Sequence, residues 1–113
     1  MTVPYDEILT VTLRREPGCT HVVVAGELDI ATAGRIEREV RVLLAGGCAA
    51  VAIDLRELEF IDSSGVHELL RCRDHALTRG ARLHVLVAPG PVSRALDMCG
   101  VRGVLDGGSP AAA

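Results

Sequence analysis

A nearly continuous apolar run at residues 49–55 limits the folds open to this chain more than any other feature. It reads AAVAIDL, with a Gly-Gly pair shortly before it and charged residues directly after it. A strand whose two faces are both apolar is typical of the centre of a sheet that packs against helices. We therefore expect residues 49–55 to form a central strand that is covered on at least one face.

Two strand patterns precede this run. Residues 8–14 alternate apolar and polar side chains, a Glu-Pro-Gly turn occupies 16–18, and residues 21–25 are rich in Val. Two strands joined by so short a turn predict an antiparallel hairpin.

A helical pattern lies between the hairpin and the central strand. From Ala33 the apolar side chains recur every three or four residues until Gly46, which supplies a stop. Asp29 and Thr32 are the two candidates for the N-cap of this helix, because their side chains can accept hydrogen bonds from its first amides.

The chain after residue 65 continues to alternate between helical and strand patterns. Arg73 falls within the apolar arc of the next helix, so its stem must lie over the core while its guanidinium reaches solvent. The expected elements are a helix from Val66 that ends at Gly80, a buried strand at 83–88, a short helix at 92–99 and a last strand at 101–105.

This order of elements predicts an α/β fold. Alternation of strand and helix implies parallel pairing of the later strands, so we expect one mixed sheet, an opening hairpin followed by parallel strands, packed against α-helices. The 113 residues suffice for one domain and are too few for two. We assign residues 8–106 to this domain, 1–7 to a lead-in and 107–113 to a disordered tail.

Charge and composition argue against binding to nucleic acid. All 12 basic residues are Arg; they are scattered among 15 acidic residues, and the net charge is −3. No basic stripe is available for a phosphate backbone. Tyr5 and Phe60 are the only aromatic residues, which leaves no platform for stacking of bases.

The sequence also predicts a cytoplasmic protein. No apolar run reaches the length of about 18 residues that a membrane-spanning helix requires, and the first residues do not resemble a signal peptide. The four cysteines have neither metal-binding nor tight disulfide spacing. We expect them to be free thiols that act as small buried apolar side chains: Cys19, Cys48, Cys72 and Cys99.

The stretch FIDSSG at 60–65 lies at the predicted turn from the central strand to a helix, where a serine nucleophile could stand. A nucleophile elbow would need Gly-x-Ser-x-Gly, but Ile61 or Asp62 occupies the place of the first glycine. The neighbouring Asp62 also disfavours an alkoxide on Ser63. Neither His75 nor His84 is tied to the serine by the sequence, so we expect no enzyme activity.

Metal and cofactor sites lack their motifs. His67 and Glu68 begin HELLR, yet Arg71 stands where the zinc motif HExxH has its second histidine. There is no Lys for a phosphate-binding loop of the Walker type and no GxGxxG. We expect neither a metal nor a cofactor.

Two interpretations of FIDSSG remain. Asp62 or Ser63 suits a helix N-cap, which stabilises a helix by about 1 kcal/mol, but a cap accounts for one polar residue and not for three in succession. A phosphate on Ser63 would meet the free N–H groups and positive dipole end of the helix. The helix would then tolerate the anion, and a partner docked there would meet roughly −1.5 to −2 added charges.

The combination of GELD at 26–29 with FIDSSGV at 60–66 resembles the STAS domain, and more narrowly the bacterial anti-sigma factor antagonists. The resemblance extends from about residue 8 to residue 105. It implies a protein without catalytic activity that binds an anti-sigma factor, itself a serine kinase, and so releases a sigma factor for transcription. Phosphorylation by that kinase would end the interaction, and a metal-dependent serine phosphatase would restore it.

The same resemblance implies where the site lies. Ser63 corresponds to the phosphate acceptor, and Asp29 of GELD is expected close to it. Family members commonly have a small residue where this chain has His67. The residues expected to contact the partner or to lie near the acceptor are Asp29, Asp62, Ser64, Gly65, Val66 and His67. The alternative is a STAS scaffold subunit of a transporter or lipid-trafficking complex, in which Ser63 only caps the helix.

Overall fold

The computed structural model describes residues 8–105, and the expected lead-in and tail fall outside them. The elements are the strands β1 (Leu9–Glu16), β2 (Cys19–Leu28), β3 (Ala50–Ile61) and β4 (Arg82–Leu86), and the helices α1 (Arg35–Ala45), α2 (Ser63–Thr78), α3 (Pro91–Met98) and α4 (Arg102–Leu105).

The four strands form one mixed sheet in the order β1-β2-β3-β4. β1 pairs with β2 antiparallel, and β2–β3 and β3–β4 are parallel pairs. This confirms the predicted hairpin and the parallel strands that follow it. The sheet grows in one direction along the sequence, and right-handed crossovers then place both connecting helices on the same face.

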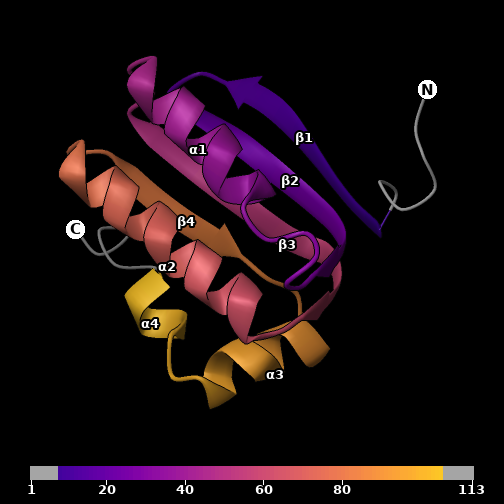
Figure 1. Cartoon of the computed structure of the whole chain (residues 1–113). Coiled ribbons are helices and arrows are strands. Elements are labelled where there is room, and N and C mark those ends of the chain that lie inside the picture. Colours follow the sequence, from indigo (N-terminus) through magenta and orange to yellow (C-terminus); the bar gives the residue numbers. More distant parts are fainter. Residues whose placement is uncertain (1–7, 106–113) are drawn as a thin grey trace.

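Helices α1 and α2 lie side by side on that face, while α3 lies beyond the N-terminal end of α2 (Figure 1). The core lies between this helical layer and the sheet. Burial of one such aliphatic side chain stabilises the fold by about 1.5–3 kcal/mol. Core side chains of the central strands and the two helices that are at most 1% exposed include Val22, Val24, Ile53, Leu55, Ile36, Val40 and Leu69.

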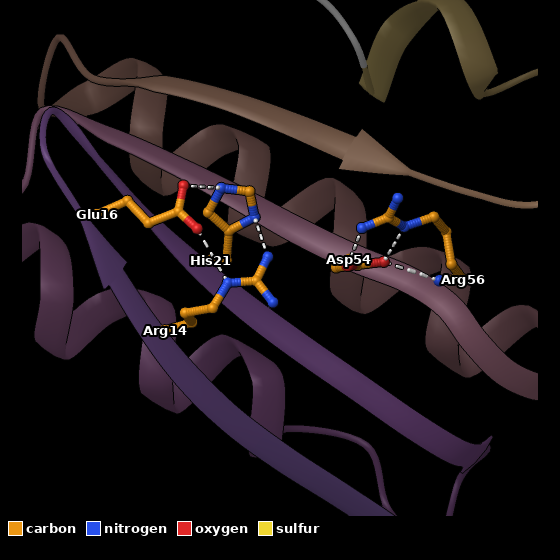
Figure 2. Close-up of polar contacts among 5 residues, drawn as sticks. All are labelled: Arg14, Glu16, His21, Asp54 and Arg56. Atoms are coloured by element: carbon orange, nitrogen blue, oxygen red, sulfur yellow. Dashed lines mark hydrogen bonds and ion pairs between the residues drawn. The ribbon is translucent and has the colours of Figure 1, made fainter.

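The opposite face of the sheet carries polar side chains (Figure 2). Asp54 on β3 points to this face and is nonetheless only 4% exposed. Arg56 donates to it twice, from Nε to Oδ1 at 2.9 Å and from NH2 to Oδ2 at 2.8 Å. These hydrogen bonds hold the pKa of Asp54 below its ordinary value, so the carboxylate stays ionised and partnered in the middle of the sheet.

The central strand is longer than the sequence indicated. β3 continues to Ile61, six residues past the apolar run, because Leu58 and Ile61 are buried and pair with Gly26 and Leu28 of β2. The charged residues of this continuation are exposed, which is why the sequence pattern indicated an earlier end.

The prediction of a last strand at 101–105 is wrong. Residues 102–105 form the short helix α4, and the side chain of its last residue, Leu105, is buried. Arg102 NH1 donates to Ser93 Oγ at 2.8 Å, which ties α4 to α3. Both edges of the sheet are therefore formed by β1 and β4 within the described residues.

The structure also tests the predicted burial of Arg73 and of the four cysteines. Arg73 is half-buried with its head paired to Asp74, as its place in the apolar arc requires. Cys72 is fully buried, and burial raises the pKa of its thiol far above the ordinary value, so it stays protonated. All four thiols are free, but Cys99 is exposed, and its assignment to the core is wrong.

Gly26 is required where β2 bends. Its φ is +105°, and a Cβ atom would overlap the carbonyl oxygen of Ile8, the residue directly before β1. The register between β2 and β3 shifts at the same point, between Gly26 and Glu27. The glycine of GELD therefore permits both a left-handed backbone and close approach of the neighbouring strand.

We predict that Gly26→Ala lowers the free energy of unfolding by about 2–3 kcal/mol, since it adds both backbone strain and overlap. Gly18→Ala is the matched control, because Gly18 also has a positive φ, +79°, but has open space around it. The control should lose about 1 kcal/mol. Urea denaturation measures both, and equal losses would show that the contact with Ile8 does not matter.

Candidate functional site

The two sequence motifs meet at one end of the sheet. Leu28, in GELD, pairs with Ile61, which directly precedes DSSG, and the amide of Asp62 donates to the carbonyl of Leu28 at 3.2 Å. β2 and β3 are parallel, so their carboxyl ends lie together. Asp29 and Asp62, which are 33 positions apart (62 minus 29), thus follow directly after adjacent strand ends.

Asp62 caps α2. Its backbone is extended, with φ −115°, and its Oδ1 accepts a hydrogen bond from the amide of Gly65 at 3.2 Å. Its carbonyl accepts the first intrahelical hydrogen bond, from Val66, at 3.0 Å. Of the two caps that the sequence allowed, the structure selects Asp62, which leaves the hydroxyl of Ser63 outside the capping interaction.

Gly65 and Val66 lie in the packing beneath this turn. A Cβ atom on Gly65 would come within 2.8 Å of both Leu28 Cγ and Ile61 Cγ1, and both of those side chains are buried. Val66 is 5% exposed and belongs to the core. A side chain larger than hydrogen at position 65 would push the start of α2 away from the sheet.

Ser63 is the exposed first residue of α2. Ser64 is half-buried, and His67 is exposed four residues further on, on the same side of the helix as Ser63. Within residues 8–105 no histidine forms a hydrogen bond with Ser63.

The acid of GELD shapes its own turn. Asp29 Oδ1 accepts from the amides of Ala31 at 2.9 Å and Thr32 at 3.2 Å, while Thr32 Oγ1 donates to the carbonyl of Glu27 at 3.0 Å. The expectation that Asp29 or Thr32 caps α1 is wrong. Their hydrogen bonds are used within this turn, and the residue at the N-cap of α1 is Gly34.

The side chain of Glu68, on α2, accepts a hydrogen bond from the first turn of α1. It is completely buried, and its Oε2 accepts a hydrogen bond from the amide of Glu37, in the first turn of α1, at 2.8 Å. A carboxylate is favoured at a helix N-terminus, where amides are unpaired and the dipole is positive. In the sequence, Glu68 stands out only as part of an incomplete zinc motif. Its place among the buried residues of an amphipathic helix was the available signal.

Glu37 in turn links α1 to α2. Its carboxylate accepts from Arg71 Nε at 2.9 Å, and its Oε2 lies 2.7 Å from His75 Nε2. Burial by itself would raise the pKa of Glu37, but the hydrogen bonds from Arg71 and His75 outweigh it and hold the pKa below the ordinary value. The helix that carries DSSG is thereby fixed to its neighbour through two glutamates.

A lowered pKa makes this link sensitive to acid. An ionised Glu37 stabilises the fold at neutral pH, and this stabilisation is lost as the pH falls below the ordinary value of 4.5 and through the lower value in the fold. We predict that Glu37→Gln loses about 1 kcal/mol at neutral pH and declines less steeply in acid than the unchanged protein.

Urea denaturation at a series of pH values checks this prediction. Glu39→Gln is the matched control, because Glu39 lies on the same helix and its side chain has no hydrogen bond or ion pair within residues 8–105. Parallel stability curves for Glu37→Gln and the unchanged protein in acid would contradict the role assigned to Glu37.

Comparison with known proteins decides the family. A family model described as "Mlab, STAS domain" matches residues 11–106, nearly the whole chain. The chain belongs to the STAS domain family. The site at the carboxyl ends of β2 and β3 therefore lies on a fold that other STAS domains share. Among the described residues, no helix is long and apolar enough to span a bilayer.

Individual relatives carry related names. The anti-sigma-F factor antagonist RsfB of Mycobacterium tuberculosis is 30% identical over 86 residues, which cover 76% of this STAS domain chain and 69% of RsfB. A solved anti-sigma factor antagonist from Mycobacterium paratuberculosis matches with a TM-score of 0.78 and 23% identity, over 92% of this chain and 86% of the other.

The fold is also similar to that of SpoIIAA from Bacillus. Its unphosphorylated form matches with a TM-score of 0.70 and 22% identity, over 83% of this chain and 84% of SpoIIAA, and its phosphorylated form has been solved as well. The structural matches confirm the predicted single α/β domain with its mixed sheet.

Proposed function

We propose that this STAS domain is an anti-sigma factor antagonist: it binds an anti-sigma factor in the cytoplasm and so releases a sigma factor for transcription. The name of RsfB, at 30% identity, supports this assignment. So does the site, which presents a hydroxyl and a histidine on the surface at the start of α2. The activity is one of binding, without metal or cofactor.

Phosphorylation of Ser63 is the proposed switch, and the observation that carries it is the exposed position of this residue at the start of a long helix. Because Asp62 already supplies the cap, a phosphate on Ser63 replaces no hydrogen bond on which the fold depends. It would instead meet the free amides of the first turn. Fold stability and surface charge are therefore separable at this residue.

Exposed apolar side chains near Ser63 provide a surface that a partner protein can contact. Ile30, one residue after GELD, is 80% exposed, and Phe60, just before DSSG, is 47% exposed. Glu27 and Phe60 are paired in the β2–β3 ladder, which brings the two segments together. We propose that these residues, with Asp29, Ser64 and His67, form the docking surface, and that phosphate added in their midst repels the partner.

The first test asks which hydroxyl accepts phosphate. The protein is incubated with the kinase encoded beside it or co-purified with it and with radiolabelled ATP. We expect incorporation to be abolished in Ser63→Ala and retained in Ser64→Ala, the matched control on the adjacent residue. Undiminished incorporation in Ser63→Ala would remove Ser63 as the acceptor.

The second test asks whether charge at this residue controls binding. Ser63→Asp should weaken binding to the anti-sigma factor by at least about tenfold, as measured by titration calorimetry. Ser63→Asn has nearly the same shape without the charge and should stay within about threefold of the unchanged protein. Equal affinities for the Asp and Asn variants would contradict an electrostatic switch.

The alternative, a STAS scaffold subunit that does not switch, makes the opposite prediction. Its Ser63 would belong to the first turn of α2 and have no other role, so neither phosphate nor Ser63→Asp would alter partner binding. The phosphatase expected from the resemblance would then have no substrate here. In the proposed function, a metal-dependent serine phosphatase removes the phosphate from Ser63 and restores binding.

A further inference from the structure

A second surface lies away from the DSSG site. Helix α1 from Arg38 onward and the C-terminal end of α2 border a groove with a volume of about 640 Å³. The residues that line it are Arg38, Arg41, Val42, Leu44, Ala45, His75, Thr78 and Arg79. His75 lies 12 residues after Ser63 along α2 (75 minus 63), so the groove begins about 18 Å from the proposed switch.

Three arginines among these lining residues have no carboxylate partner. Five other arginines of the described chain form ion pairs, but Arg38, Arg41 and Arg79 do not. All three are exposed, and no Asp or Glu is among the lining residues. The net charge of the chain is −3, so a purely cationic patch here is a local departure from the overall balance.

The ends of the two helices do not account for this charge. Each helix C-terminus carries about half a negative charge, so two ends together amount to about one. Three arginines exceed that by about two positive charges. The ring of His75 is held by Glu37, whose Oε2 lies 2.7 Å from His75 Nε2. The groove therefore keeps an electrostatic preference for anions.

The groove also has an apolar side. Val42 is 65% exposed and lies between Arg38 and Ala45 along the face of α1 that borders the groove, at the three- and four-residue spacing of one helix face. A compact anion such as free phosphate would leave this side chain in water. An extended ligand with both carboxylates and apolar side chains would cover Val42 and neutralise the arginines together.

We propose that this groove binds an acidic amphipathic segment of a partner protein. The inference does not depend on the proposed function of Ser63. Because the two surfaces lie at opposite ends of α2, both can be occupied at once.

The test uses a fluorescent peptide probe of about 15 residues with Glu and Leu on one helical face, and a neutral analogue with Gln in place of Glu. Anisotropy titrations with the full chain should show saturable binding of the acidic peptide. The triple variant Arg38→Gln/Arg41→Gln/Arg79→Gln should weaken that binding by at least about tenfold.

The matched control is Arg15→Gln/Arg82→Gln/Arg94→Gln. These three arginines are also exposed and form no ion pair within residues 8–105, but they lie on β1, β4 and α3, outside the groove. Both triples change the net charge equally, so the control should bind within about twofold of the unchanged protein. Equal loss in both triples, or equal binding of the neutral peptide, would overturn the proposal.

A second pair of variants tests whether the apolar side chain of Val42 contributes to peptide binding. Val42→Ser should weaken peptide binding by about threefold, whereas Leu77→Ser, at a 49% exposed position of α2 outside the lining, should not. No effect of Val42→Ser would show that charge alone acts, which contradicts an amphipathic ligand. Ser63→Asp should leave the affinity for this peptide unchanged, so failure here and failure of the phosphorylation switch are distinguishable.

Two further experiments test for other occupants of the groove, a second copy of the chain and an anionic membrane. Sedimentation velocity shows whether the protein self-associates, and vesicles of phosphatidylglycerol and phosphatidylcholine show whether it binds an anionic membrane. Self-association that is lost in the groove triple would identify a second copy of the chain as the occupant. Vesicle binding that is lost in the groove triple, without peptide binding, would identify a lipid surface. Either result would overturn the proposal.

Discussion

The close approach of β2, β3 and the start of α2 is the constraint on which the site depends. The amide of Asp62 donates to the carbonyl of Leu28, and this hydrogen bond continues the parallel ladder to the last residue before the helix. Gly65 then fits between Leu28 and Ile61, where no Cβ atom has room. This contact fixes the direction in which α2 leaves the sheet, and with it the exposure of Ser63.

The division of roles between neighbouring residues makes a chemical switch compatible with a stable fold. Asp62 caps the helix, Gly65 and Val66 pack against the sheet, and Ser63 carries none of these interactions. A second pair of contacts, through Glu68 and Glu37, holds α2 to α1 from its other side. A change of charge at Ser63 is therefore expected to alter what binds and to leave the helix in place.

Local patterns in the sequence predicted much of the fold, and non-local contacts set what they missed. The apolar run at 49–55 indicated the central strand correctly, but its charged continuation to Ile61 is ordered by pairing with β2, with register shifts that no period-two pattern reveals. In the site, the cap at Asp62 joins residues only three positions apart, so the sequence pattern was able to predict it. The contact of Glu68 with the amide of Glu37 joins two helices 31 positions apart, and the arginine groove depends on how those helices lie together.

The central claim is that phosphate on Ser63 changes binding without changing the fold. The most direct measurement compares the phosphorylated and unphosphorylated forms of the same protein, both for affinity to the anti-sigma factor and for the midpoint of thermal unfolding. We expect phosphorylation to cause a large loss of affinity while the unfolding midpoint stays nearly the same. Unchanged affinity, or a loss of affinity that accompanies a marked fall in the midpoint, would contradict it.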